Sequence, residues 1–561
     1  MKHCTRLLLI GVLLIITMPL FPQNVFLELN LCSRTSQSFT SSFRTVRNLE
    51  LIRVIERAGN DKKIGGIILN ISSYRADINA LWELRNTLEK FKSKGKYICA
   101  FISNADLDIY CLATVADKIV MDDLGILTMM GYAWGQGYVQ NSLEKLGVGV
   151  RELRYFTYKS AAEAFTRSSL SDADRKQYGE ILDDIITTTR NTVTKARMWT
   201  DDDFNNILDN EFMFSARSAL ERGLVDRSGR KEAVLGLIKE ITGEDNAKFV
   251  IYGDHDSSIT ESISVYGPAR ASFRSPVIAV VNANGATDME QGIGAWNLSK
   301  TIIELSNNKR VKAIVLRINS PGGSAEAADY VCEAIKTAKT KVPVVVSMGA
   351  VAASGGYWAS MSASHIVASP VTMTGSIGVI MTWFYDNGLN SKLGLAVDTM
   401  QRGKHADLYS GMILPIRDIR EEEEARFREY IFDLYADFTS RVAANRGMDI
   451  KLVESLAEGR VYSGIGALNA GLIDSIGGLD DAIRIAHELA KIPENKKVAY
   501  REYPKPNYFD WIFNNLISIK ANNRNATAFL QTPILEDIRY RIAHNGKVMP
   551  IMPLNSVWHI Y

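Results

Sequence analysis

The sequence is poor in the residues that build several common kinds of functional site. Its 561 residues include 5 cysteines, which are scattered, and this excludes a disulfide framework and a zinc-binding cysteine cluster. Most of these cysteines lie in apolar runs, so we expect buried free thiols. The 7 histidines leave few candidates for a histidine general base. The glycine-rich loops match neither the P-loop nor the dinucleotide-binding fingerprint.

Charge of one sign is also lacking. The chain has 65 basic and 63 acidic residues, a formal net charge of +2, without the basic excess that marks a nucleic-acid-binding protein. Its 46% hydrophobic and 23% charged residues are typical of a globular protein and exclude disorder of the whole chain. A length of 561 residues favours more than one domain.

The N-terminus departs from this globular composition. Lys2 and Arg6 precede an uncharged stretch from Leu7 to Leu27. At about 1.5 Å per residue, this stretch is long enough to cross a hydrocarbon core about 30 Å thick. No small-x-small cleavage site follows it, so we expect an uncleaved signal anchor within residues 1–28, with a cleaved signal peptide as the alternative. In either case the rest of the chain is exported.

The chain contains an internal repeat. The apolar segment Ile64–Ile71 resembles Val311–Ile318, and the same shift of 247 positions pairs Tyr110 with Tyr357. A nearly constant shift over much of the chain indicates duplication. The predicted organisation is therefore two homologous domains with a linker rich in Asp and Ser between them. The boundaries are 1–28 for the anchor, 29–250 for the first domain, 251–275 for the linker, 276–500 for the second domain and 501–561 for a C-terminal extension.

Each repeat alternates short apolar runs with longer helix-like stretches. The runs are rich in Val and Ile and do not alternate with polar residues, as expected for strands buried on both faces of a parallel sheet. The fold class is therefore α/β. In the second half the predicted strands are Val277–Val281, Val311–Ile318, Val342–Ser347 and Ile366–Ala368, and the clearest helices are Ala325–Ala338 and Glu421–Ala443.

Two glycine-rich loops follow predicted strands of the second half. They are Asn319–Ser324 and Met348–Tyr357, and ligands of open α/β sheets bind at such strand ends. Glycine lets a backbone N–H approach a substrate oxygen closely, so the loops could form an oxyanion hole. A phosphate or thioester cradle, or tight turns alone, are alternatives.

Ser354 lies in the second loop at a predicted helix start. A helix N-cap is one interpretation, and a nucleophile that needs a base to activate it is the other. His365 and His405 are the histidines nearest in sequence. His405 with Asp407 is a candidate base, but neither histidine completes a recognisable triad.

The repeat points to a lysine instead. Lys159 corresponds to Ala406 in the second repeat, whereas Ser354 corresponds to Leu107 in the first. One repeat thus has the lysine and the other the serine, which suggests one site shared between the two domains. Lys404 lies two positions from the vacant place and is a rival base.

The second half contains four specific motifs: Ser320–Ser324, Ala352–Tyr357, Thr374–Val379 and Gly459–Gly464. With these motifs the sequence resembles signal peptide peptidase A, also called protease IV, in its long duplicated form, over about residues 45–490. The resemblance implies two tandem domains with a fold like those of crotonase and Clp protease, and a membrane-anchored Ser/Lys peptidase that degrades cleaved signal peptides.

The resemblance also implies roles for individual residues. Ser354 matches the nucleophile, Lys159 the general base, and Ser376 a serine that orients the lysine amine. The backbone N–H groups of Gly323 and Gly355 fall where oxyanion donors are expected. Around the lysine only three residues, Tyr-Lys-Ser, agree with the family's common Gly-Lys-Tyr-Lys-Ser segment.

A lysine serves as a base only in a suitable environment. With its ordinary pKa of about 10.4 it is almost fully protonated at pH 7, whereas burial disfavours the ammonium and lowers the pKa by several units. The neighbours Tyr155, Phe156, Ala161 and Ala162 are consistent with an apolar pocket. The mechanism needs no metal and no organic cofactor.

The expected partners follow from the resemblance. Substrates are extended apolar peptides that pair with a strand edge, and the other partners are a membrane and further copies in a homo-oligomer, expected to be a tetramer, with no nucleic acid. The expected location is the bacterial inner membrane, as a single-pass protein with its catalytic domains on the periplasmic face. Alternatives are an inactive scaffold or binding protein of the same fold, and a crotonase-like acyl-CoA enzyme, which export disfavours. The extension Arg501–Tyr561 packs against a neighbour or the membrane, or is an ordinary terminal extension.

Overall fold

The structure is a computed structural model that describes most of the chain. It covers residues 25–31, 45–72, 74–243, 248–252, 275–493, 496–504, 533–552 and 556–559. The predicted anchor up to residue 24 and most of the predicted linker lie outside these ranges. Within them, no helix combines the length and apolar character needed to cross a bilayer.

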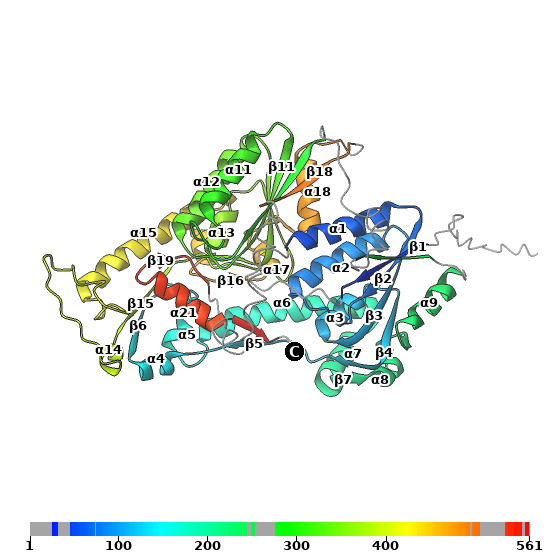
Figure 1. Ribbon diagram of the computed structural model, residues 1–561, viewed down its shortest axis with the longest axis horizontal. Coiled ribbons are helices and arrows are strands. Elements are labelled where there is room, and N and C mark those ends of the chain that lie inside the picture. Colours follow the sequence, from blue (N-terminus) through cyan, green and yellow to red (C-terminus); the bar gives the residue numbers. More distant parts are fainter. Residues whose placement is uncertain are drawn as a thin grey trace, which may run out of the picture.

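The N-terminal half builds an α/β layer structure (Figure 1). In the described residues its main sheet has seven strands in the order β7-β4-β3-β2-β1-β9, with β8 beside β4. Pairings are parallel except that of β7 with β4. The strands are β1 (Val25–Asn30), β2 (Ile64–Asn70), β3 (Tyr97–Ala105), β4 (Lys118–Thr128), β7 (Met213–Ser215), β8 (Arg227–Ser228) and β9 (Lys248–Tyr252). The helices are α1 (Thr45–Asn60), α2 (Ile78–Lys92), α3 (Leu107–Ala113), α6 (Asp172–Arg197), α7 (Asp201–Asn206), η1 (Ile207–Glu211), α8 (Ala216–Glu221) and α9 (Glu232–Thr242).

The C-terminal half repeats this arrangement. Over the same described ranges its main sheet has eight strands, in the order β16-β14-β12-β11-β10-β18, with β13 beside β12 and β17 beside β13. The strands are β10 (Val277–Asn284), β11 (Val311–Ser320), β12 (Val344–Ala353), β13 (His365–Ala368), β14 (Met373–Gly375), β16 (Val461–Tyr462), β17 (Ser475–Ile476) and β18 (Ala499–Tyr503). The helices are α11 (Ala295–Asn307), α12 (Ala325–Lys339), α13 (Gly355–Ser360), α15 (Glu421–Arg446), α16 (Ile450–Leu456), α17 (Gly464–Asn469) and α18 (Leu479–Leu489). The predicted strands and both predicted helices are present.

Equivalent residues make equivalent contacts in the two halves. The Tyr110 hydroxyl donates to the carbonyl of Leu224 at 2.8 Å, and the Tyr357 hydroxyl donates to that of Leu472 at 2.9 Å. The carboxylate of Asp226 likewise accepts from the N–H of Ile119 at 2.8 Å, as Asp474 does from that of Ile366. The duplication seen in the sequence is therefore a duplication of structure.

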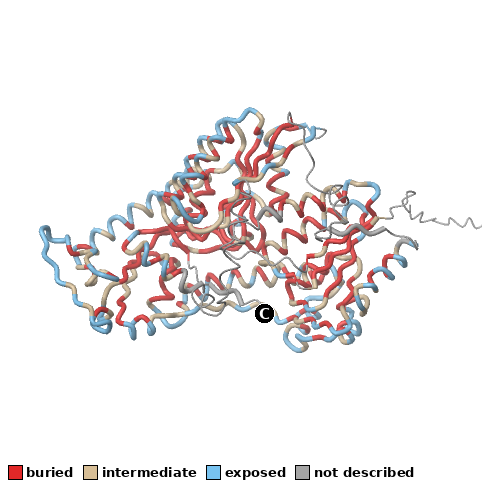
Figure 2. The backbone as a smooth tube through the Cα atoms, viewed as in Figure 1, coloured by how far each residue is buried: buried red, intermediate tan, exposed pale blue. Residues whose placement is uncertain are grey.

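Burial explains why these segments form strands. Every residue of β2 is buried, and in β11 most residues are buried as well, as the continuous apolar runs predict for a sheet covered on both faces. Figure 2 shows the buried residues concentrated along the strands and the inward faces of the helices.

A small sheet joins the two halves. Strand β6 (Val148–Leu153) of the first half pairs antiparallel with β15 (Ile380–Asp386) of the second, and β19 (Val548–Met549) pairs with the other edge of β15. Because β6 crosses over to β15, the residues that follow β6 lie against the second half. Short helices α4 (Gln140–Leu146), α5 (Glu163–Thr166) and α14 (Leu389–Lys392) flank this sheet, and α21 (Pro533–Ala543) precedes β19. Strands β5 (Ala133–Gln136) and β20 (Ser556–His559) are far apart in sequence and form a separate antiparallel pair.

Three strands cross the predicted segment boundaries. The predicted anchor segment, residues 1–28, overlaps β1 (Val25–Asn30), where Phe26 and Leu27 are buried and pair with β2. The predicted limits at 250 and 500 fall inside β9 and β18, which are the outermost strands of the two sheets. Each sheet therefore uses a few residues beyond the expected limit.

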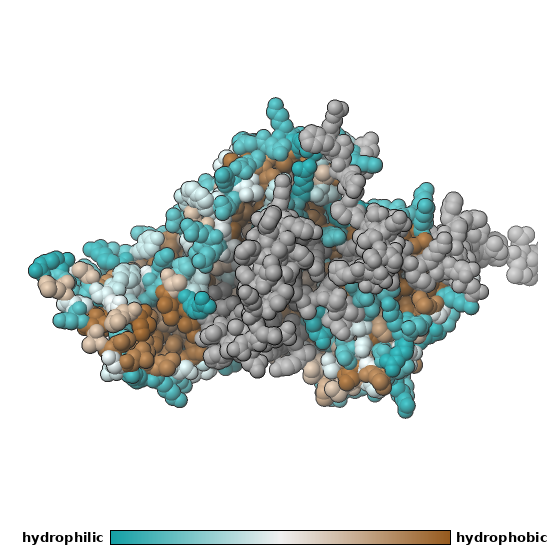
Figure 3. Space-filling view, in the orientation of Figure 1, coloured by the Kyte–Doolittle hydropathy of each residue, from teal (hydrophilic) through white to brown (hydrophobic). Residues whose placement is uncertain are grey.

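The surface is mixed in character. Figure 3 shows hydrophobic side chains gathered at the lower left, over the part of the molecule that contains α4, β6 and β15. Large apolar residues with high exposure include Leu146 at the end of α4, at 56%, and Leu393, which follows Leu389–Lys392 (α14), at 55%. Elsewhere in Figure 3 most of the coloured side chains are hydrophilic, with a smaller hydrophobic group at the lower right.

Candidate active site

Ser354 lies at a sharp turn between a strand and a helix. Strand β12 ends at Ala353 and α13 begins at Gly355, and Ser354 between them has φ 57° and ψ −113°. A positive φ is strained for a residue other than glycine and occurs often at functional sites. The turn is held by the Ser354 N–H, which donates to the Gly375 carbonyl at 2.7 Å. The side chain of Ser354 is fully buried.

Lys159 reaches Ser354 from the other repeat. It follows β6 in a tight turn whose Tyr158 N–H donates to the carbonyl of Glu458 at 2.9 Å. The Lys159 Nζ lies 2.6 Å from Ser354 Oγ, and 2.9 Å from both the Oγ and the carbonyl oxygen of Ser376. Three oxygens thus surround one amine, and the lysine is 1% exposed.

The environment disfavours a charge on this amine. Burial is the largest cause and lowers the pKa of Lys159 well below its ordinary value, and the positive charge of Arg541 lowers it further. Phe156, Ala161 and Ala162 are buried beside it, as their apolar character predicts. The lysine therefore populates its neutral form at much lower pH than an exposed lysine does.

A glycine makes room for the lysine turn. Gly459 has φ +83°, and a Cβ at this position would lie 2.6 Å from Lys159 Cβ and 2.7 Å from Lys159 Cα. Any larger residue would push the lysine turn away from Ser354. The Gly459–Gly464 motif noted in the sequence thus supports the amine, a role that its sequence alone did not reveal.

Two backbone amides converge at the end of β12. The N–H groups of Gly323 and Gly355 donate to one acceptor, the carbonyl oxygen of Pro550, at 3.0 and 2.9 Å. Gly323 has φ +147°, and a Cβ on Gly355 would lie 2.6 Å from Thr287 Oγ1. Both positions therefore require glycine, and the two amides form a cradle for a single oxygen.

The C-terminal helix α21 supplies a residue that the sequence analysis missed. Arg541 Nη2 donates to the Ala161 carbonyl at 2.7 Å, and Nε donates to Asp537 Oδ1 at 2.7 Å. Arg541 and Asp537 are each 1% exposed. The extension beyond residue 501 thus packs against the lysine segment of the same chain, and Figure 1 shows α21 (red) beside α5 and β19.

The rival residues lie in other environments. Lys404 is 67% exposed and pairs with Glu422 at 2.7 Å. His405 Nδ1 lies 2.8 Å from Glu423 Oε1, while Asp407 pairs with Arg417, which holds the pKa of Asp407 at about 2. In the described part of the chain, the contacts of these residues do not reach Ser354.

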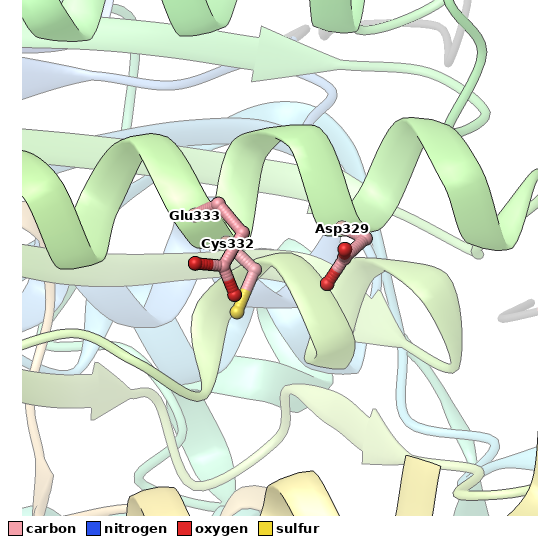
Figure 4. A group of neighbouring side chains, drawn as sticks. All are labelled: Asp329, Cys332 and Glu333. Carbon is pink, nitrogen blue, oxygen red and sulfur yellow. The ribbon is translucent and has the colours of Figure 1, made fainter. Parts of the chain in front are cut away.

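Three side chains that could hold a metal ion gather on α12. The ligand atoms of Asp329, Cys332 and Glu333 lie within 4.8 Å of one another (Figure 4). Arg441 Nη1 already pairs with Asp329 at 2.7 Å and with Glu333 at 3.2 Å. Burial raises the pKa of the Cys332 thiol to about 11, which disfavours the thiolate that a metal requires. We read this group as a salt-bridge cluster.

The fold and site together define the class of the protein. The family model of Clp protease matches residues 288–371, and the chain is a serine peptidase with a Clp-protease-like α/β fold present in two copies. The model of peptidase family S49 matches residues 90–243 and 336–493, once in each repeat. The chain belongs to peptidase family S49, which confirms the resemblance noted in the sequence.

Relatives of similar organisation support this assignment. The chain is 30% identical over 492 residues to the chloroplastic serine protease SPPA of Arabidopsis thaliana, covering 86% of this chain and 71% of that protein. It is 32% identical over 473 residues to Protease 4 of Salmonella typhi, covering 81% and 74%. With Protease 4 of Haemophilus influenzae the identity is 30% over 474 residues, covering 80% and 73%. Peptides are therefore its substrates.

Proposed function

We propose that Ser354 and Lys159 form a Ser/Lys dyad that hydrolyses extended apolar peptides, including cleaved signal peptides. The observation that carries this proposal is the 2.6 Å separation between the Lys159 amine and the Ser354 hydroxyl, both of them buried. A buried, neutral amine within hydrogen-bond distance of a hydroxyl is the arrangement that general-base activation of serine requires.

Ser376 orients the base in this proposal. A neutral lysine has two N–H donors and one lone pair. The carbonyl and the hydroxyl of Ser376, each 2.9 Å from Nζ, take the two donors. The lone pair then faces the remaining neighbour, the Ser354 hydroxyl, and accepts its proton.

The reaction then proceeds through an acyl-enzyme. Ser354 Oγ attacks the peptide carbonyl carbon while Lys159 takes the hydroxyl proton, and the N–H groups of Gly323 and Gly355 stabilise the oxyanion. The C–N bond breaks as the lysine ammonium returns its proton to the leaving amine. Water, deprotonated by the same lysine, hydrolyses the ester and restores the serine. These steps call on no metal or organic cofactor.

The proposal includes a division of labour and a location. The first domain contributes the base and the second contributes the nucleophile and the oxyanion donors. The uncharged residues 7–24 anchor the protein as a single span in the bacterial inner membrane, with the catalytic domains on the periplasmic face. We further propose a homo-oligomer, expected to be a tetramer. Support for the anchor and oligomer comes from the sequence and from the apolar surface near β6 and β15 (Figure 3).

The test is cleavage of a leucine-rich peptide by the full chain and by three variants. Ser354→Ala should abolish peptide cleavage. Lys159→Ala should lower kcat/KM by about 10²–10⁴-fold, the usual contribution of a general base. Lys404→Ala is the matched control, because that lysine is exposed and paired with Glu422, and should retain activity. Equal activity in all four proteins would reject the dyad. Peptide binding without any cleavage would instead favour an inactive scaffold of the same fold.

A further inference from the structure

The end of the chain runs through the candidate active site. Residues Val548 and Met549 form β19, which pairs antiparallel with Met381 and Ile380 of β15. The next residue, Pro550, places its carbonyl oxygen between the N–H groups of Gly323 and Gly355, at 3.0 and 2.9 Å. The chain therefore places a main-chain carbonyl in the cradle proposed for the oxyanion.

The residues after Pro550 are also held. Ile551 forms an antiparallel bridge with Gly322, and the Met552 N–H donates to the Pro321 carbonyl at 2.9 Å. Segments on both sides of the Pro550 carbonyl thus make strand-like contacts. Peptides bound by strand addition have main-chain hydrogen bonds of this kind and alternate side chains in pockets.

We propose that the tail, residues Val548–Met552, is an intramolecular ligand of the substrate groove that competes with peptide substrates. This inference rests on the proposed peptidase function, because it takes the cradle of Gly323 and Gly355 to be the oxyanion site. The groove then consists of the β15 edge before the carbonyl and the Pro321–Gly323 loop after it.

The burial of the tail indicates the class of ligand. Met549 and Ile551 are 4% and 0% exposed and pack in an apolar cluster with Phe165 and Ile380. Met552, at 2%, packs instead against Val351, Ala353 and Val371. The groove therefore takes apolar side chains on both sides of the carbonyl, and its peptide ligands should be apolar at these positions.

The tail is tethered close to the groove. Asn545 Nδ2 donates to the Phe384 carbonyl and its Oδ1 accepts from the Phe384 N–H, both at 2.8 Å. Together with the Arg541 hydrogen bond to the Ala161 carbonyl, these contacts hold the chain to β15 and to the lysine segment just before the tail. A ligand on a short tether has an effective concentration on the order of millimolar, so a free peptide must compete against it.

The test is peptide binding in a chain that cannot turn over. In the Ser354→Ala background, we would measure binding of a fluorescent peptide with the sequence Val-Met-Pro-Ile-Met, with and without Ile551→Asp/Met552→Asp. Burying two carboxylates is unfavourable, so these changes should release the tail and tighten peptide binding at least tenfold. Lys547→Ala, at an exposed position just before β19, is the matched control and should leave affinity unchanged.

A second tail variant keeps the test possible if the double aspartate variant does not fold. Met552→Pro adds no charge, but it removes both the N–H that donates to Pro321 and the buried Met552 side chain, and it should also tighten binding. Unchanged affinity in both folded tail variants would overturn the inference. Cleavage assays separate this inference from the proposed function. If the unmodified chain cleaves peptide and Ser354→Ala does not, but the tail variants bind peptide no more tightly, only the inference about the tail is wrong. If the tail variants bind peptide more tightly but no cleavage depends on Ser354, the inference about the tail is supported and the peptidase mechanism is wrong.

Discussion

Three features of its surroundings set the protonation and orientation of the Lys159 amine. Burial removes the water that would stabilise an ammonium, Arg541 adds a repelling charge, and Ser376 offers two oxygens to the amine. The first two disfavour the protonated form, and in the proposed mechanism the third directs the lone pair toward Ser354. This environment is the one that a lysine base requires near neutral pH, which an exposed lysine lacks.

The pH dependence of activity should report this lowered pKa. In the proposed mechanism the deprotonated amine is the active form, so kcat/KM should rise with pH through the pKa of Lys159 and then level off. Because burial and Arg541 lower that pKa from its ordinary 10.5, the rise should be centred well below 10.5. The measurement is a pH–rate profile for peptide cleavage, and a rise centred near 10.5 would contradict the buried, neutral lysine.

A buried carboxyl requires a control for this profile. The pKa of Asp174 is raised to about 6, chiefly by burial, so its own deprotonation also falls below 10.5. Asp174→Asn removes that titration and leaves the amine of Lys159 in place. The rise that persists in Asp174→Asn is the one to assign to the lysine.

At the residue scale, the sequence predicts those residues of the candidate site that lie in a recognisable sequence pattern. Ser354 stands in a glycine-rich loop after a strand, and Lys159 stands where the other repeat has Ala406, so both could be proposed, and the structure brings them together. Their catalytic roles stay predictions. Arg541 and Pro550 could not be found in this way, because Arg541 contacts Ala161 across 380 positions of sequence, and nothing in either local sequence indicates that partner.

At the scale of elements, the site depends on two additions to the repeated sheets. Strand β6 pairs with β15 over six residue pairs, from Val148–Asp386 to Leu153–Met381, and this carries the lysine turn into the second half. Helix α21 then packs Arg541 on that turn. Neither addition belongs to the main sheets, which explains why the sheet pattern read from the sequence did not reveal how the two repeats share one site.

Arg541 should act on the base through its charge. Arg541→Gln removes a positive charge near Lys159, so the pKa of the lysine should rise and the rise in kcat/KM should move to higher pH. Arg541→Lys keeps the charge and should restore the position of that rise. The measurement is the same pH–rate profile, recorded for both variants and for the unmodified chain.

Stability must be separated from this effect. Arg541→Gln leaves the buried Asp537 without its partner, which typically costs about 3–5 kcal/mol. Asp537→Asn/Arg541→Gln removes the unpaired charge and should recover much of the unfolding free energy, while the pH–rate profile stays shifted. A profile that returns with stability would show that Arg541 has only a structural role.

The strands and helices themselves were largely predictable from the sequence. Runs such as Val311–Ile318 do not alternate regularly with polar residues, and a parallel sheet covered on both faces buries most of such a run. The boundaries of the elements were less predictable. The sequence analysis assigned Val25–Leu27 to the end of a membrane segment, because an apolar strand and an apolar membrane span have the same composition. Pairing with β2 decides between them, and that contact is not local.

At the scale of the whole molecule, the two repeats meet through a buried ion pair and a second, partly exposed group of ion pairs. Arg317 of β11 forms a bidentate ion pair with Glu83 of α2, with Nη1–Oε1 at 2.7 Å and Nη2–Oε2 at 3.0 Å. The two side chains are 8% and 4% exposed. Nearby, Lys90 of α2 pairs with Asp480 at 2.6 Å and with Asp481 at 2.7 Å. These contacts hold the repeat with the lysine against the repeat with the serine.

Removing one partner of the buried pair should therefore affect both stability and activity. Glu83→Gln leaves the Arg317 guanidinium buried without a counter-charge, and we expect a loss of about 3–5 kcal/mol in unfolding free energy, measured by urea denaturation. Peptide cleavage should fall with it, because the serine and the lysine come from the two halves that this pair joins.

The matched control is Glu429→Gln, which breaks an ion pair of similar length, 2.8 Å, whose side chains are 80% and 63% exposed. Such exposed pairs contribute about 0–1 kcal/mol to the free energy of unfolding. Replacing both buried partners, as in Glu83→Leu/Arg317→Met, should cost less than Glu83→Gln because no charge is then left buried alone. Equal losses for Glu83→Gln and Glu429→Gln would mean that the contact between the repeats is carried by other residues.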